Sequence, residues 1–187
     1  MNPLAAFAGL LMLALLSGCT SNAPVVSPNT AGHVNLNRYQ GLWYEQARLP
    51  MFFQRNCAQS EASYQLKADG SIDVLNRCRN QAGVWEQAHG TARPQVAGNT
   101  DKLWVEFDNG FSRLFPGVAK GNYWVLYVSD DYQYAVVGNP NRKYLWLLSR
   151  SRVVPASIRE LLMAKARQQG YDTDRLIWRA SDSSIGR

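Results

Sequence analysis

Eight short runs rich in β-branched and aromatic residues follow one another along this chain, separated by Gly, Asn, Asp or Pro residues. Connections such as residues 129–131 and 139–142 are short enough to join neighbouring runs as hairpins. This arrangement predicts an all-β domain in which eight antiparallel strands run up and down and close into a barrel. The expected strands are residues 43–49, 58–66, 71–78, 84–93, 102–107, 122–128, 132–138 and 144–150.

The hydrophobic period changes after the last of these runs. Apolar positions recur with helical spacing, Pro155 can occupy the first turn, and Gly170 is placed to end the helix. We expect one amphipathic helix of roughly fourteen residues on the outer wall of the barrel, in preference to a helix lying on a membrane. Residues 176–178 then form a short strand against the first one. The helical spacing is set by Ile158, Leu161, Leu162, Lys165 and Ala166.

The N-terminus has the features of a bacterial lipoprotein signal. Residues 4–16 are apolar but too few to span a bilayer, and they resemble the core of a signal peptide. They end in Leu16-Ser17-Gly18-Cys19, which resembles the lipobox at which such signals are cut before an acylated cysteine. We expect residues 1–18 to be removed and Cys19 to carry the acyl chains.

The residues after this cysteine indicate how the rest of the chain is organised. Residues 19–33 are rich in Ser, Asn, Pro and Thr without periodicity, which predicts a flexible tether. Thr20 rather than Asp follows the cysteine, which favours the outer membrane. We expect the protein on the periplasmic side of that membrane, although the residue after the cysteine does not determine the leaflet. Residues 34–180 then form one domain with a substantial core, and residues 181–187 form a disordered tail.

The formal net charge of +6 has two interpretations. A basic protein held near a membrane is attracted to lipid phosphates, whereas an ordinary solvated basic surface carries the same charge. The Lys and Arg residues are scattered along the sequence. Together with a location outside the cytoplasm, this argues against a nucleic-acid partner. The sequence leaves the formation of a homodimer open.

Cys57 and Cys78 remain as an even pair in a compartment that permits disulfides. They bracket a hairpin whose turn, residues 67–70, contains Asp-Gly. If side chains alternate strictly between the two faces of the sheet, Cys57 and Cys78 do not fall on the same face. A disulfide between them therefore requires an irregular start to the second strand. We expect the disulfide in preference to a catalytic thiol.

Three short segments far apart in the chain belong together: Gly41-Leu42-Trp43, Asp131-Tyr132 and Arg150. They resemble the three-part signature of the lipocalins. From about residue 35 to residue 178 the chain looks like the bacterial outer-membrane and apolipoprotein D-like members of that family. The resemblance implies that Arg150 covers Trp43 and seals one end of an eight-stranded barrel, through a cation–π contact of roughly 0.5–2 kcal/mol. The other end is then an open mouth.

Alternation along the strands indicates which side chains face the cavity. Trp146 shares a face with Arg150, so it points into the barrel above the sealed end. The resemblance adds Tyr64 and Asn76, which match a pocket tyrosine and a pocket asparagine of the family. Alternation adds apolar residues of the third and fifth strands. The expected ligand-binding residues are Tyr64, Val74, Asn76, Leu103, Val105, Phe107 and Trp146.

An aromatic and aliphatic wall with few polar groups suits a chain-like amphiphile. By resemblance, we expect fatty acids or lysophospholipids, bound and stored or transported at the outer membrane in envelope maintenance or stress. Arg48, Arg113 and Lys120 are candidates for binding an anionic head group, although such residues are more often solvated surface charges.

An enzyme built on the lipocalin fold is the alternative function. It needs a pair of carboxylates inside the barrel, and we expect the acidic residues to lie in turns or to point outward. His33 and His89 are the only histidines, and the sequence has no Gly-x-Ser-x-Gly elbow and no Gly-rich phosphate loop. Haem would require an inward-facing histidine. We therefore predict a binding protein without a cofactor, a metal or catalytic residues.

Overall fold

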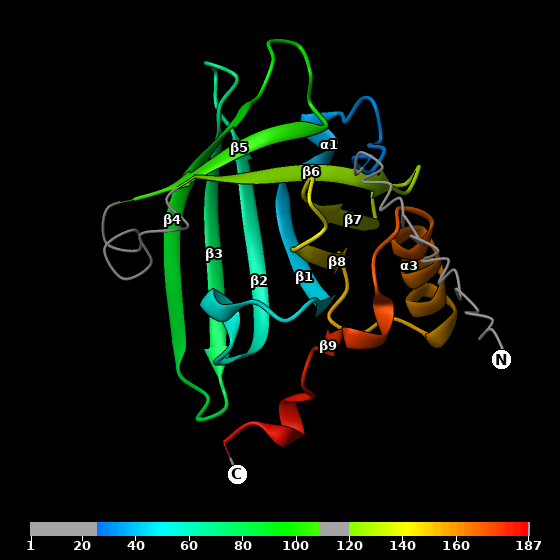
Figure 1. Cartoon of the computed structure of the whole chain (residues 1–187). Coiled ribbons are helices and arrows are strands. Elements are labelled where there is room, and N and C mark those ends of the chain that lie inside the picture. The colour runs from blue at the N-terminus through cyan, green and yellow to red at the C-terminus, as the bar shows by residue number, and fades with distance from the viewer. Residues whose placement is uncertain (1–25, 109–119, 187) are drawn as a thin grey trace, which may run out of the picture.

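A computed structural model gives the structure of residues 26–108 and 120–186 (Figure 1). Its barrel strands are β1 (Gly41–Arg48), β2 (Cys57–Leu66), β3 (Ile72–Asn80), β4 (Trp85–Pro94), β5 (Lys102–Phe107), β6 (Lys120–Val128), β7 (Tyr134–Gly138) and β8 (Leu145–Ser149). Each strand pairs antiparallel with the next, and β1 pairs with both β2 and β8, which closes the barrel. This topology confirms the fold predicted from the eight sequence runs.

One strand starts later than its sequence run because a tight turn precedes it. The run that begins at Tyr132 becomes β7 only from Tyr134, since Tyr132 has a φ of 59°, in the left-handed region. Asp131 supports this turn, because its Oδ1 accepts from Ser129 Oγ at 2.6 Å and from the backbone N–H of Gln133 at 3.1 Å. The hydrogen bond from Ser129, and then that from Gln133, lowers the pKa of the Asp131 carboxyl.

Helix α3 (Ala156–Gln168) packs against the outside of β7 and β8, as its sequence spacing predicts. Its two fully buried side chains, Leu162 and Ala166, join an apolar cluster on the outer wall of the barrel that also contains Val136 and Leu147. Full burial of a leucine contributes roughly 1.5–3 kcal/mol. The apolar stripe of the helix is therefore used for packing on the barrel.

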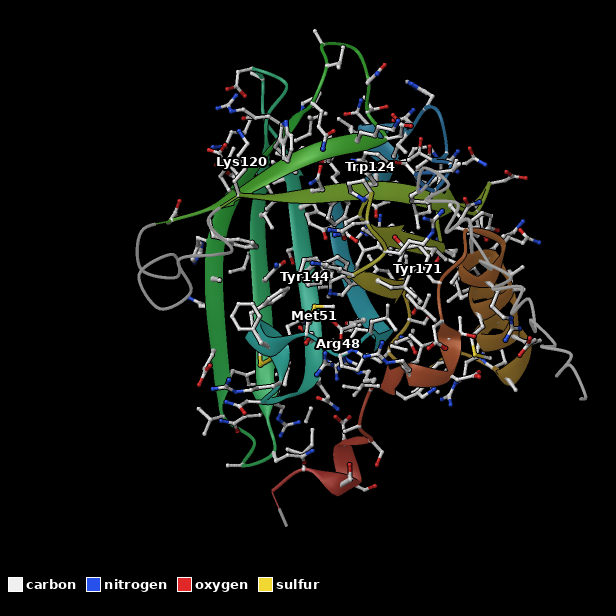
Figure 2. The ribbon with its side chains drawn as sticks, viewed as in Figure 1. Arg48, Met51, Lys120, Trp124, Tyr144 and Tyr171 are labelled. Atoms are coloured by element: carbon white, nitrogen blue, oxygen red, sulfur yellow. A yellow bond between two sulfur atoms is a disulfide. The ribbon has the colours of Figure 1, made fainter. Side chains whose placement is uncertain are left out.

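Tyr171 ties the end of this helix to the barrel. Its hydroxyl accepts from the backbone N–H of Asn139 at 3.0 Å and donates to the Asn139 carbonyl at 2.9 Å. A Cβ at Gly138 would overlap this hydroxyl, so only glycine allows the close approach. Figure 2 labels Tyr171 and Trp124, two members of the outer cluster. Beyond them, the short strand β9 (Ile177–Trp178) pairs with β1.

Arg150 closes one end of the barrel. Its guanidinium carbon lies 3.8 Å from the ring centre of Trp43, which is fully buried. Arg150 Nη1 donates to the Leu42 carbonyl at 2.7 Å, and Nη2 donates to the Gln40 carbonyl at 2.8 Å. Trp43 Nε1 in turn donates to the Tyr39 carbonyl at 2.7 Å. The seal therefore combines a cation–π contact with charge-assisted hydrogen bonds.

A short helix under the sealed end supplies some of these carbonyls. Helix α1 (Leu36–Tyr39) begins after Asn35, whose side chain accepts from the backbone N–H of Arg38 at 3.2 Å. Four residues are too few to show a helical period, so the sequence did not reveal it. Gly41 follows with a φ of +93°, and a Cβ there would lie 3.4 Å from Arg150 Nη1. The glycine of the signature thus allows the chain to turn beneath the arginine.

The segment before α1 is bound to the barrel over part of its length. The expected tether, residues 19–33, differs from the structure from Pro28 onward, where the proline is buried. Thr30 Oγ1 and the backbone N–H of Gly32 both donate to Asp101 Oδ2. Short polar segments carry no periodicity, so contacts with a distant loop cannot be read from them.

The C-terminal end also differs from its prediction as a disordered tail over residues 181–187. It forms a short helix, η3 (Asp182–Ser184), and Gln59 Nε2 donates to the carboxylate of its first residue at 2.8 Å. Ile185 is only 9 % exposed. Contacts with β2 therefore order a segment whose own composition is polar.

Replacing Arg150 with alanine should lower the free energy of unfolding by roughly 1–3 kcal/mol, because the cation over Trp43 and the donors to the α1 carbonyls are lost. Chemical denaturation followed by circular dichroism measures the change. Arg55→Ala, which removes an exposed arginine between β1 and β2, is the control and should leave the midpoint unchanged. A wild-type midpoint for Arg150→Ala would reject the sealing role.

Candidate ligand-binding site

Apolar side chains fill the inside of the barrel near the sealed end. Val74, Leu103 and Val105, three of the predicted pocket residues, are buried there in one cluster with Ile72. Tyr64 lies opposite Val74 in the pairing of β2 with β3, and it packs against the same cluster. Phe107, the last residue of β5, also packs against this cluster, so the structure brings five of the predicted residues together on the inner wall.

Three tyrosines complete this part of the interior. The hydroxyls of Tyr39 and Tyr123 are 2.8 Å apart, and the rings of Tyr64 and Tyr123 meet edge-on with their centres 5.9 Å apart. Desolvation inside the barrel raises the pKa of Tyr64 to about 12, and it also raises the pKa values of Tyr39 and Tyr123, so the phenols stay neutral. The cavity beside them measures about 20 Å³, little more than the ~10–15 Å³ that one water molecule needs.

Toward the mouth, inward-facing side chains keep accessible surface. Asn76, Phe107 and Trp146 face the interior by strand register, yet each is only half-buried. Asn76 pairs with small residues on both sides, Ala62 on β2 and Ala88 on β4. Because an inward-facing side chain exposes its surface to the lumen, this surface marks unfilled space inside the barrel.

Asn76 also offers an acceptor in this part of the barrel. Its Oδ1 is buried and has no hydrogen-bond partner among the described residues. A buried acceptor without a partner costs about 1–3 kcal/mol. A ligand that donates a hydrogen bond to Asn76 would recover that free energy.

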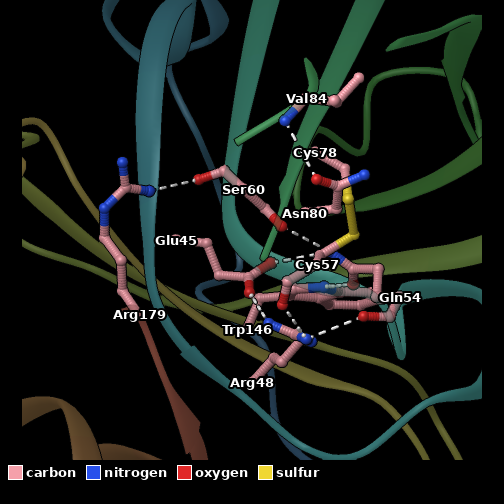
Figure 3. The surroundings of a disulfide bond; sticks show 10 residues. All are labelled: Glu45, Arg48, Gln54, Cys57, Ser60, Cys78, Asn80, Val84, Trp146 and Arg179. Atoms are coloured by element: carbon pink, nitrogen blue, oxygen red, sulfur yellow. Dashed lines mark hydrogen bonds and ion pairs between the residues drawn. A yellow bond between two sulfur atoms is a disulfide. The ribbon is translucent and has the colours of Figure 1, made fainter. Parts of the chain in front are cut away.

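An ion pair lies inside the barrel near the mouth (Figure 3). Glu45 and Arg48 are 5 % and 2 % exposed, with Arg48 Nη1 2.8 Å from Glu45 Oε1. Two sequence expectations are therefore wrong: Arg48 is not a solvated charge, and not every acidic residue points outward. Side chains alternate along a strand, so the inward-facing Trp43 already places Glu45, two residues later, inside the barrel. A register shift after Glu45 then turns Arg48 inward, opposite Trp146.

Gln54 connects this ion pair to the loop between β1 and β2. It ends the short helix η1 (Phe52–Gln54), and its Nε2 donates to Glu45 Oε2 at 2.9 Å. Its Oε1 accepts from Trp146 Nε1 at 2.8 Å, and its carbonyl accepts from Arg48 Nη2 at 2.8 Å. Hydrogen bonds from inside the barrel thus hold η1 at the mouth. Nothing in the sequence marks Gln54, because a single loop glutamine belongs to no pattern.

Cys57 and Cys78 form the disulfide that the even cysteine pair predicts (Figure 3). The register of β2 against β3 shifts between Cys57 and Gln59, which is the irregular strand start that the bridge requires. The Cys57 carbonyl also accepts from Arg48 Nη2 at 2.8 Å. The bridge therefore fixes the chain directly after η1, beside the buried ion pair.

The other candidate residues lie away from the lumen. Lys120 is on the outer wall, 2.9 Å from Glu106, and Arg113 lies outside the described residues. His89 is exposed on the outer face of β4, so it does not supply the inward ligand that haem requires. Within residues 26–108 and 120–186, no three His, Cys, Asp or Glu side chains are grouped to hold a metal.

Comparison with known proteins gives a family match along most of the chain. The lipocalin-like domain family matches residues 34–181. Outer membrane lipoprotein Blc of Vibrio cholerae is 38 % identical, over 90 % of this chain and 94 % of that protein. Temperature-induced lipocalin-1 of Arabidopsis thaliana is 39 % identical, over 76 % of this chain and 77 % of that protein.

A solved structure agrees at the level of the fold. Insecticyanin from the tobacco hornworm Manduca sexta is similar with a TM-score of 0.64, at 20 % identity, over 87 % of this chain and 88 % of that one. At this identity the likeness concerns the fold alone. The family match and the two relatives above 30 % identity show that the chain belongs to the lipocalin-like domain family.

Proposed function

We propose that this protein is a membrane-anchored lipocalin that binds and stores or transports a lipophilic ligand at the outer membrane, in envelope maintenance or stress. The ligand is a fatty acid or a lysophospholipid. The observation that carries the proposal is the accessible inner surface of Phe107 and Trp146, two aromatic residues that face an unfilled lumen. An apolar ligand gains roughly 25 cal/mol for each Å² of its surface that such a wall covers.

The lumen changes in character along its length, which suits an amphiphile. The polar end lies toward Asn76 and the mouth, and the apolar tail points from there toward the deep wall, where side chains leave a cavity of only about 20 Å³ and must move apart to admit it. Arg48 is not assigned to an anionic head group, because both of its terminal nitrogens already have acceptors. The proposed contacts are Tyr64, Val74, Leu103 and Val105 at the deep end, and Asn76, Phe107 and Trp146 toward the mouth.

Catalysis on the same fold has less support. Glu45 is a carboxylate inside the barrel, but Arg48 neutralises it and Gln54 donates to it, so it is part of a structural network. The relatives compared above are named as a lipoprotein and a lipocalin rather than as enzymes. Ligand binding therefore explains the observed interior without any catalytic residue.

Acyl chains on Cys19 are proposed to hold the protein at the periplasmic side of the outer membrane. The signal peptide and Cys19 lie outside the described residues. Among the residues that are described, no helix has the length and apolar character to cross a membrane. The Vibrio cholerae relative is named an outer membrane lipoprotein, which supports the anchor. Since Pro28 is already buried, the proposed tether ends before this residue.

Titration with a long-chain fatty acid or lysophospholipid should quench tryptophan fluorescence, and Trp146→Phe should remove most of that change, because Trp146 faces the lumen. Trp178→Phe is the matched control: this tryptophan lies on β9, outside the barrel, so the quench should stay as in the wild type. An unaltered quench in Trp146→Phe would show that the ligand does not lie beside this residue.

Cys19→Ala should block acylation, so metabolic labelling with a clickable fatty acid should mark the wild-type protein and not the variant. A soluble chain that begins at Val26 keeps the contacts of Pro28 and Thr30. It should bind lipid with wild-type affinity, because tethering raises the effective concentration of ligand without changing the site. Unlabelled wild-type protein would refute the anchor, and a soluble chain that fails to bind would refute the lumen as the site.

A further inference from the structure

The net charge of this protein is concentrated in one part of the chain. Residues 139–179 contain nine basic and three acidic side chains, so this segment carries a formal charge of +6. The whole chain carries the same formal charge, which means that the remaining residues sum to zero. The segment includes β8, α3 and β9, and Figure 1 shows α3 and β9 on the opposite side of the barrel from β3 and β4.

Cations on the two sides of the barrel differ in their partners. Near β3 and β4, Lys67 lies 2.6 Å from Asp73 and Arg93 lies 3.4 Å from Asp69, so these exposed cations are neutralised by acids. On the side of α3, Arg167 pairs with Glu160 and Arg179 lies 3.8 Å from Glu61, but three exposed arginines form no ion pair with any acid in the part of the chain that the structure describes. They are Arg152, Arg159 and Arg175.

Two of these arginines lie over aromatic rings. The guanidinium of Arg152 is 5.5 Å from the ring centre of Tyr44, and that of Arg159 is 5.2 Å from the ring of Trp178. Trp178 pairs with Ala47, on the same strand as Tyr44, so both rings lie along the outside of β1. Both cation–ring contacts therefore lie on the outer side of β1 and β9.

One exposed apolar side chain belongs to the same surface. Val153, the residue directly after Arg152, is 77 % exposed although it is hydrophobic. Cations, interfacial aromatic rings and exposed aliphatic groups together are typical of surfaces that contact lipid. We name this set the basic face: Tyr44, Arg152, Val153, Arg159 and Trp178.

The chain leaves the described domain next to this side of the barrel. The backbone N–H of Asn29 donates at 2.8 Å to Oε1 of Gln169, the residue directly after α3. Seven residue steps separate Val26 from Cys19, a reach of at most about 25 Å. The thirteen residues of α3 span roughly 20 Å. A membrane that holds Cys19 is thus held close to α3.

We propose that the basic face rests against phospholipid head groups and holds the barrel in one orientation on the membrane. Guanidinium groups match the geometry of lipid phosphates, and Trp and Tyr rings favour the head-group level. Each arginine near an anionic surface strengthens partitioning about fivefold. The proposal rests on the acyl anchor proposed above, since the short tether is what brings this face to the lipid.

The test uses the full acylated chain in vesicles of phosphatidylethanolamine and phosphatidylglycerol that contain a nitroxide-labelled lipid. A fluorophore is attached at Val153→Cys in one protein and at Val84→Cys in another. Val84 is 56 % exposed and lies between β3 and β4, on the other side of the barrel. The native pair Cys57 and Cys78 is bridged and does not react. Quenching should be several-fold stronger at position 153 than at position 84.

Charge reversal shows whether the arginines cause this difference. Arg152→Glu with Arg159→Glu should abolish the excess quenching at position 153. Lys67→Glu with Arg93→Glu makes the same change in net charge on the other side and should leave the excess intact. Equal or stronger quenching at position 84, or an excess that survives reversal of the basic face, would overturn the proposal.

Two further measurements separate this proposal from the proposed function. Cosedimentation with vesicles reports whether the acyl anchor exists, and the fluorescence of Trp146 reports whether the lumen binds lipid. If the chain proves to be unacylated, it is added to preformed vesicles of the same composition. The same two comparisons, between labelled positions and between charge variants, then decide whether the basic face binds lipid.

Discussion

The contact between Arg150 and Trp43 decides which end of the barrel is closed and which is open. One guanidinium covers the indole, binds the carbonyls at the end of α1 and binds the Leu42 carbonyl at the start of β1. It therefore joins the end of the last barrel strand to the beginning of the first. Because this end is sealed, a ligand can enter only at the other end. Along every strand, the inward-facing residues therefore run from the closed end to the open mouth.

The register shift in β1 determines the chemistry of that mouth. It turns Arg48 into the barrel, where Glu45 neutralises it and two backbone carbonyls accept from its Nη2, while its buried Nε has no hydrogen-bond partner among the described residues. Burying an ion pair costs free energy unless further hydrogen bonds complete it, and Gln54 supplies one of them. The deep wall is apolar and the mouth is polar, so the lumen as a whole matches a molecule with a long apolar tail and one polar end.

The outer surface divides in a similar way. The basic residues of the barrel wall around β3 and β4 have acidic partners, whereas residues 139–179, the segment that includes α3 and β9, carry a formal charge equal to that of the whole chain. The proposed ligand site uses the inside of the barrel, while the proposed lipid contact uses only the outside of α3, β9 and β1. The two faces of β1 therefore differ: Glu45 and Arg48 face inward and hold the mouth, and Tyr44 faces outward.

The sequence by itself determined the strands, the helix α3 and the inward facing of Trp146, because each follows from a local period of two or of 3.6 residues. The even cysteine pair likewise predicted the bridge between Cys57 and Cys78, including the irregular strand start. Only the tertiary structure decided that Arg48 faces inward, that Gln54 holds the mouth and that Pro28 is buried. A one-residue shift in register reverses every later side chain, and contacts between distant segments leave no trace in local periodicity, so these features become visible only when the strands are paired.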